Sequence, residues 1–266
     1  MGESDPVNTA ESGVEARTWF IRGRNVLAAR AELGDLYVDY YLHLAKYRIH
    51  PEPEHDALFK RSLAIFLLHC TSRPWNEHHA WTINFQNPRV NVFLVADNES
   101  GAVTGRVFAE NVKEMPDNLF YADVVRGAEP KRRSAVAFTG NDPLAAVEKF
   151  YLQSEQRMAR GFQIAEEDFL LLTEHPDCDL AWLQSLTSAE AAGLDQNETL
   201  ALLERRIYRW HCGCNQQRMM EVLAPAMRKD PEDIFGSEPK LEICCPRCGA
   251  RHVITREAME SYIDDK

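Results

Sequence analysis

His211-Cys212-Gly213-Cys214 and Cys245-Pro246-Arg247-Cys248 decide how the end of this 266-residue chain folds. Thirty residues separate the two motifs, and five of the seven cysteines fall between positions 212 and 248. A C-x-C pair and a C-x-x-C pair each supply two sulfurs from one tight turn, which together satisfy tetrahedral zinc. Gly213 and Gly249 relax the backbone beside the sulfurs. The sequence therefore predicts one zinc ion per chain, held by Cys212, Cys214, Cys245 and Cys248.

Other roles for nearby residues remain open at this point. His211 and His252 are rival ligands, although four well-spaced thiols leave them little need to bind. Cys244 is either a bystander or a thiol that exchanges with Cys245 once zinc is lost. A set of unrelated core thiols is the plainer alternative to a zinc site. A permanent disulfide framework is less favoured, because no secretion signal is evident and a cytoplasmic location is expected.

Composition restricts the classes of function. Hydrophobic residues make up 45% of the chain, enough for a substantial core. The formal net charge of −11 disfavours nucleic acid as the main partner. No apolar run reaches the roughly 18 residues of a membrane span. These observations predict a cytoplasmic protein that binds neither nucleic acid nor membrane.

The pattern of apolar residues predicts an α+β fold: an amino-terminal mixed sheet packed with helices, a helical linker and a small carboxy-terminal zinc module. Residues 1–16 are polar and acidic and are expected to form a disordered tail. Strands are expected at 18–32, 81–85, 90–96, 103–109, 119–125, 134–139 and 160–172, and helices at 36–47, 55–70, 141–156, 179–186, 188–193 and 197–208.

Smaller features receive structural interpretations. Ser188 and Asn197 are expected to cap their helices, and Asp142-Pro143 to start another. His78-His79, beside Glu77, is interpreted as a loop, because the Glu-x-x-His spacing of a metal site is missing. The basic run at 131–133 is expected to be a solvated loop, with contact to acidic clients as the alternative.

Two patches resemble heat shock protein 33, a redox-regulated bacterial holdase chaperone. The first runs from His211 to Glu260 and contains both cysteine motifs, a helix opening at Asn215 and a terminal helix from about Arg256. The second is Tyr151, Ser154, Glu155 and Gln156, a structural motif at the end of a helix. No Gly-x-Ser-x-Gly elbow surrounds Ser154, so a packing role is expected. The segment at 166–178 departs from the family pattern.

The resemblance implies that successive parts of the chain form domains with different functions. Residues 17–178 would form the amino-terminal α+β substrate-binding domain, and residues 179–210 a helical, metastable linker lying on it. Residues 211–266 would form the zinc-binding redox-switch domain. It further implies unfolded client proteins as partners, a homodimer on activation, and disulfides Cys212–Cys214 and Cys245–Cys248 in the oxidised chain.

A comparison of free energies predicts that the carboxy-terminal zinc module unfolds when its cysteines are oxidised. A structural zinc site contributes roughly 10–16 kcal/mol in small modules. Disulfides closing loops of three and four residues contribute only about 1.6–1.9 kcal/mol each in the loop-entropy model. Two such disulfides do not replace the metal, so loss of zinc is expected to unfold the module and release the linker.

The leading prediction is therefore a holdase activated by oxidation, without catalytic turnover. The alternative is a zinc-ribbon binding or regulatory protein with a purely structural zinc. Residues 211–266 hold eight Lys/Arg and ten Asp/Glu, whereas a nucleic-acid ribbon is normally basic. An enzyme with catalytic zinc is disfavoured, because four thiols leave no open position for water.

Overall fold

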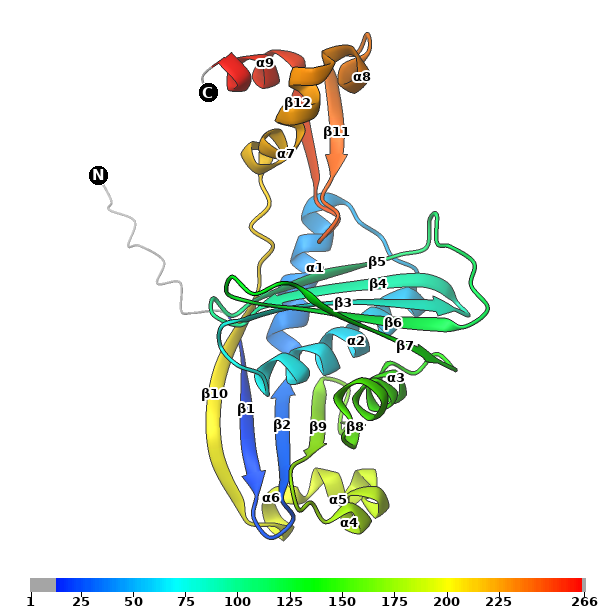
Figure 1. Ribbon diagram of the computed structural model, residues 1–266, viewed down its shortest axis with the longest axis vertical. Helices are drawn as coiled ribbons and strands as arrows, with labels where there is room; N and C mark the ends of the chain where they lie inside the picture. Colours follow the sequence, from blue (N-terminus) through cyan, green and yellow to red (C-terminus); the bar gives the residue numbers. More distant parts are fainter. Residues whose placement is uncertain (1–12, 265–266) are drawn as a thin grey trace, which may run out of the picture.

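The computed structural model describes residues 13–264. It has a body built on a large sheet and a smaller carboxy-terminal segment standing at one end of it (Figure 1). The strands of the large sheet are β1 (Val14–Ile21), β2 (Val26–Glu32), β3 (Glu77–Gln86), β4 (Arg89–Asp97), β5 (Ala102–Phe108), β6 (Asn118–Arg126), β7 (Arg132–Phe138), β8 (Ala159–Gln163), β9 (Asp168–Glu174) and β10 (Leu200–Trp210). Within the described residues these strands are ordered β7-β6-β3-β4-β5-β10-β1-β2-β9-β8.

Helices fill the spaces around the sheet. Those of the body are α1 (Gly34–Tyr47), α2 (Pro53–Thr71), α3 (Pro143–Phe150), the π-helical turn η1 (Tyr151–Glu155), α4 (Leu180–Ser185), α5 (Ser188–Ala192) and α6 (Leu194–Asn197). All residues from Ser62 to Thr71 of α2 are buried. A helix that is apolar on all sides belongs in a core, and α2 packs there against Trp81, Phe85 and Phe120 from the strands.

The predicted α+β class is confirmed, and most elements lie where the pattern placed them. β3, β4 and β5 form the expected meander, in which Trp81, Ile83 and Phe85 alternate inward. Asp142 accepts a hydrogen bond from the Leu144 backbone N–H at 3.0 Å and caps α3 as predicted. Two strands, β8 and β9, occupy the expected region at 160–172.

The helix predicted over 197–208 is wrong, because Leu200–Trp210 is strand β10. It pairs antiparallel with β1, and Arg209 and Trp210 pair in parallel with Ala102 and Val103 of β5. β10 thus joins the two halves of the sheet. Leu203 and Ile207 suggest helical spacing, but the free edge of β1 needs a partner for its backbone groups. That demand arises only in the folded protein.

Corrections at the amino terminus concern the tail and the first strand. Residues 1–12 of the predicted tail lie outside the described residues, whereas residues 14–16 belong to β1 and pair with β10. The single strand expected at 18–32 is a hairpin, β1 and β2, whose turn places Gly23 at φ 80° and Asn25 at φ 50°. Glycine and asparagine tolerate this left-handed backbone best.

Three smaller interpretations are also corrected. The cap of α5 is Thr187, which forms a capping box with Glu190, and residue 197 ends α6 and caps no helix. His78 and His79 lie in β3, not in a loop. Arg132 and Arg133 begin β7, and Arg133 Nε donates to Asp123 Oδ1 at 2.6 Å.

Helices α4 to α6 cover one face of β1, β2, β9 and β8, at the end of the body opposite the carboxy-terminal segment (Figure 1). Their buried apolar side chains are Leu183, Leu186, Ala191 and Leu194. These pack on Ile21, Val26, Leu170 and Leu172 of the sheet. The opposite face of the same strands packs on the main core, so this part of the sheet lies between two apolar layers.

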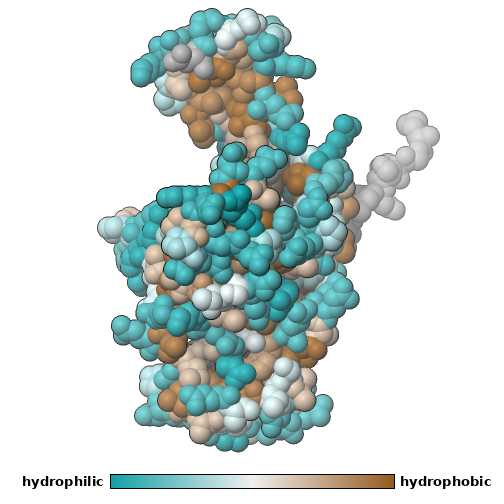
Figure 2. All heavy atoms as spheres, turned by 90° about the vertical axis from the view of Figure 1, so that its right-hand side faces the viewer, coloured by the Kyte–Doolittle hydropathy of each residue, from teal (hydrophilic) through white to brown (hydrophobic). Residues whose placement is uncertain are grey.

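The carboxy-terminal segment has its own small core. It contains α7 (Gln216–Lys229), α8 (Pro231–Phe235), β11 (Lys240–Cys244), β12 (Arg251–Thr255) and α9 (Arg256–Asp264), which confirms the terminal helix expected from Arg256. Ala224, Met227, Phe235, Ile254 and Met259 are buried together. Figure 2 shows the segment as a knob set off from the body. Among residues 13–264, none of the helices has the length and apolarity to cross a bilayer.

Candidate metal centre

The structure brings the four predicted ligand cysteines together. The sulfurs of Cys212, Cys214, Cys245 and Cys248 all lie within 4.8 Å of one another. Cys212 Sγ is 3.7 Å from Cys245 Sγ, and Cys214 Sγ is 3.5 Å from Cys248 Sγ. Zn–S bonds of about 2.3 Å in a tetrahedron give sulfur–sulfur distances of about 3.8 Å. The donor set and its spacing therefore fit a tetrahedral, thiolate-bound metal.

The first pair of cysteines is placed by the end of β10 and the start of α7. The His211 backbone N–H donates to Val103 O at 3.0 Å, which extends the pairing with β5 by one residue. Gly213 then turns the chain at φ 67°. Asn215 caps α7 by accepting from the Arg218 backbone N–H, and Arg218 Nη1 donates to Gly213 O at 2.8 Å. This turn aims both sulfurs inward.

The second pair lies on the turn between β11 and β12. The Cys245 backbone N–H donates to Ala250 O at 2.8 Å, and the Gly249 N–H donates to Cys245 O at 2.9 Å. Gly249 has φ 77°, a value that glycine adopts without strain. Cys245 and Cys248 are each only 2% exposed. This pair is thus buried in the middle of the cluster, whereas Cys212 and Cys214 are half-buried.

Electrostatics show why this cluster favours a cation. Burial and the neighbouring Cys212 raise the pKa of Cys214 to about 12. Hydrogen bonds with Cys212 and Cys245 raise the pKa of Cys248, while thiols of Cys212 and Cys248 donating to Cys245 lower its pKa. Four thiolates at this spacing require a divalent cation to offset their repulsion.

The rival ligands predicted from sequence take different positions. His252 Nε2 lies 3.3 Å from Cys214 Sγ, close enough to hydrogen-bond the sulfur. His211 is exposed and is not part of the four-sulfur cluster. Cys244 is exposed, with its Sγ 3.5 Å from Gly249 O and 3.4 Å from Arg106 Nη1. These contacts place Cys244 beside the cluster and outside it.

Three residues at the centre were missed by the sequence reasoning. His43 and Tyr47 come from α1 and Arg106 from β5, all more than 100 positions before the cysteines. Tyr47 packs against the buried cluster of Cys245, Cys248 and Ala250. The spacing of His43 and Tyr47 at i and i+4 puts them on one helix face, but nothing local in the sequence connects that face to the cysteines.

The helix-end motif lies elsewhere, in the body, with Tyr151 in the core, Ser154 and Glu155 half-buried and Gln156 exposed. Tyr151 is fully buried, and its hydroxyl is 2.9 Å from His69 Nδ1. Arg73 Nη2 donates to Glu155 Oε2 at 2.7 Å, and Ser154 Oγ lies 2.6 Å from Ser134 Oγ. Gln156 ends the helix at φ 54°. These contacts tie η1 to α2 and β7, in keeping with a packing role.

A family model described as Hsp33 protein matches residues 173–255 of this chain. That match includes both cysteine pairs, β10 and the helices α4 to α6. A curated relative, the 33 kDa chaperonin of Acholeplasma laidlawii (strain PG-8A), is 24% identical over 80 residues, or 30% of this chain. The aligned part spans 28% of the length of that relative.

A solved structure extends the likeness to the whole fold. The crystal structure of the 33 kDa chaperonin (heat shock protein 33 homologue) of Thermotoga maritima has a TM-score of 0.72 to this chain. The match covers 96% of this chain and 98% of that one, at 14% identity, and so shows a common fold. The family model and the curated relative show similarity to Hsp33 proteins over part of this chain, and the solved structure shows the same fold over nearly all of it.

Proposed function

We propose that this chain is a cytoplasmic holdase chaperone that binds unfolding proteins after oxidation of a zinc-bound four-cysteine centre. The observation that carries the proposal is the clustering of Cys212, Cys214, Cys245 and Cys248 where the carboxy-terminal segment meets the body. Zinc bound there would hold the segment folded. Its replacement by the disulfides Cys212–Cys214 and Cys245–Cys248 would leave the segment far less stable. No catalytic turnover is involved, and the activated chain is proposed to form a homodimer.

Helices α4 to α6 are the part of the linker best suited to release. They are short, and they hold the sheet through four buried apolar side chains. Each fully buried leucine contributes roughly 1.5–3 kcal/mol, whereas each ordered residue costs roughly 1–2 kcal/mol of backbone entropy. Segments with few buried contacts open first. We therefore place the released region at residues 179–199, with β10 retained in the sheet.

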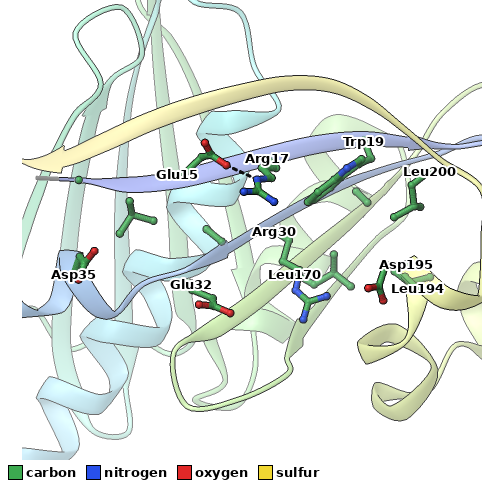
Figure 3. Close-up of a pocket in the computed structure, with 14 residues that line it drawn as sticks. Glu15, Arg17, Trp19, Arg30, Glu32, Asp35, Leu170, Leu194, Asp195 and Leu200 are labelled. Carbon is green, nitrogen blue, oxygen red and sulfur yellow. Dashed lines mark hydrogen bonds and ion pairs between the residues drawn. The ribbon is translucent and has the colours of Figure 1, made fainter. Parts of the chain in front are cut away.

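A groove beside these helices offers a first client surface. It has a volume of about 740 Å³ and lies over β1, β2 and β9, next to α6 (Figure 3). Trp19, Leu170, Leu194 and Leu200 give it an apolar side, and charged residues including Arg17, Arg30, Glu32 and Asp195 line the rest. Departure of α6 would remove Leu194 and widen the groove toward the apolar sheet face. Such a surface suits extended, partly apolar segments of unfolding proteins.

Zinc release and client protection measured on one sample test the proposal. Reduced, zinc-loaded protein is treated with hypochlorite or with peroxide at raised temperature, and free zinc is read with a chromogenic chelator. Suppression of aggregation of a thermally unfolding enzyme is then measured. Zinc release with new holdase activity, reversed by dithiothreitol, is expected. Holdase activity without oxidation would instead indicate a constitutive chaperone, and inactivity in both states a ribbon-type binding protein.

Two variants separate the ligand thiols from their neighbour. Cys212→Ser with Cys245→Ser is expected to abolish zinc binding and to loosen the carboxy-terminal segment even when reduced. Cys244→Ser is the matched control, because this exposed thiol lies beside the cluster but outside it. It is expected to bind one zinc ion and to respond to oxidant like the parent chain. A doubly substituted chain that stayed folded and unresponsive would contradict the switch.

A further inference from the structure

Two residues from the body hydrogen-bond to the second cysteine turn. His43 Nε2, in α1, is 2.9 Å from Cys248 O, and Arg106 Nη1, in β5, is 3.4 Å from Cys245 O. A carbonyl oxygen only accepts, so the proton must lie on His43 Nε2. Both acceptors are main-chain atoms of the Cys245–Cys248 turn. The positions of these two carbonyl oxygens therefore depend on the backbone fold of the turn and not on the side chains that the turn carries.

The turn also fits closely against the end of α1. A Cβ added to Gly249 would lie 3.1 Å from Ile49 Cδ1 and 4.0 Å from Arg106 Nε. Tyr47 packs against the cluster of Cys245, Cys248 and Ala250. Figure 1 shows the tip of the β11–β12 hairpin beside the end of α1 and near β5. Hydrogen bonds and packing thus converge on one small contact.

His43 also packs against Trp210, the last residue of β10. The ring centroid of Trp210 lies 5.6 Å from that of His43 and 5.1 Å from that of Tyr40, also on α1. Trp210 reaches Phe59 of α2 at 6.1 Å. A continuous set of contacts therefore runs from the Cys248 carbonyl through His43 and Trp210 into the main core. The same residue, Trp210, directly precedes the His211-Cys212 motif.

We propose that His43 and Arg106 form a latch that positions the folded Cys245–Cys248 turn on the body. The latch closes only when the turn presents both carbonyls, so loss of the turn's fold frees His43 and loosens the end of α1, while β10 stays in the sheet. By the reciprocity of coupled equilibria, opening the latch must also weaken metal retention. This inference rests on the proposed function for its role, since it supplies a direct route from the cysteine centre to the body.

Substitutions at position 43 test the latch without any chaperone assay. His43→Leu removes the donor, whereas His43→Gln keeps an amide N–H that can reach the same carbonyl. His50→Ala is a matched control, because His50 is an exposed histidine just beyond α1. Hydrogen exchange is followed in peptides covering residues 40–50 and 240–255, together with the rate of zinc transfer to a chelator.

A hydrogen bond of ordinary strength predicts effects of roughly 2- to 10-fold. In His43→Leu, exchange in both peptides and zinc transfer are expected to be faster by this factor, with the zinc stoichiometry unchanged. His43→Gln is expected to restore the parent rates. In the parent chain, removal of zinc is expected to speed exchange at residues 40–50, and in His43→Leu that response is expected to shrink.

Equal rates for His43→Leu, His43→Gln, His50→Ala and the parent would overturn the latch. So would faster exchange in His43→Leu that His43→Gln fails to restore, since this would indicate a loss of packing only. If the substitutions at position 43 have the expected effects but the chain shows no holdase activity, the proposed function is contradicted and the latch is supported. If the purified chain bound no zinc, the exchange comparison between His43→Leu and His43→Gln would still decide.

Discussion

Arg24 Nη1 lies 2.8 Å from Asp179 Oδ2, and the same guanidinium lies 3.1 Å from Glu198 Oε1. One arginine in the β1–β2 turn therefore binds both ends of the segment that carries α4 to α6. The guanidinium also lies over the ring of Trp182, 5.1 Å from its centroid. These contacts attach the segment that carries the helices proposed for release to the β1–β2 turn, both where it begins and where it ends.

Replacement of Arg24 by alanine should loosen this segment in the reduced, zinc-bound protein. Partly exposed ion pairs contribute about 0.2–1 kcal/mol each, so loss of the two pairs is expected to raise local opening of residues 179–199 about 2- to 30-fold. Hydrogen exchange of these residues, or cleavage by chymotrypsin after Trp182 and the leucines, measures the opening. Arg22→Ala is the control, because Arg22 is exposed in the same turn. Indistinguishable exchange in the two variants would show that the ion pairs of Arg24 do not stabilise this segment.

Strand β10 is expected to stay in the sheet when zinc is lost. Tyr208 is fully buried and its hydroxyl donates to Asn98 Oδ1 at 3.0 Å, while Arg206 Nη1 donates to Cys70 O at 3.2 Å. After oxidation, the amides of residues 204–208 should remain protected while those of residues 179–199 and 240–255 exchange rapidly. Simultaneous loss of protection in all three regions would show that β10 leaves with the helices.

A related substitution measures how firmly β10 is anchored. Tyr208→Phe leaves the buried Asn98 oxygen without its donor, which costs about 1–3 kcal/mol. Denaturant unfolding of the reduced protein is expected to show a loss of this size. Tyr121→Phe, in β6, is a suitable control, because that tyrosine is half-buried and its ring contact with Arg133 survives removal of the hydroxyl.

Gly213→Ala should weaken zinc retention. The φ of 67° is strained for alanine, and the added Cβ would lie 2.9 Å from Arg218 Nη1, the group that donates to Gly213 O. Left-handed strain alone costs roughly 1–2 kcal/mol, so zinc should pass to a competing chelator about 10-fold more readily. Gly127→Ala has comparable strain at φ 51° in open space far from the cysteines. It should leave zinc retention unchanged.

Stability should fall as the pH drops from about 6.5 towards 4. Burial lowers the pKa of His79 to about 4, against an opposing effect of Glu77. Because the unfolded chain binds this proton first, the stabilisation is complete above pH 6.5 and is lost as the pH falls toward the folded value. The loss is at most about 3 kcal/mol. His79→Gln should flatten the dependence of Tm on pH, whereas His78→Gln, at an exposed neighbour, should not.

Sequence reasoning succeeded where structure is set by a few adjacent residues. Cys212 and Cys214 share one turn and Cys245 and Cys248 another, and the cap at Asp142 acts within two residues. The apolar run from Leu63 to Leu68 also predicts a buried helix without knowledge of its neighbours. Such features are encoded locally, because thiol spacing, capping and apolar periodicity act over one or two turns of chain.

Only the tertiary structure decided what depends on partners distant in the chain. Residues 200–210 became a strand because the edge of β1 lacked hydrogen-bond partners, an effect that overrides the helical spacing of Leu203 and Ile207. Likewise, His43 and Arg106 meet the cysteine turn, and Arg24 meets Asp179 and Glu198, only after the sheet has assembled. The sequence by itself determined the metal-binding motifs and most of the elements, whereas the contacts that connect them arose from non-local pairing and packing.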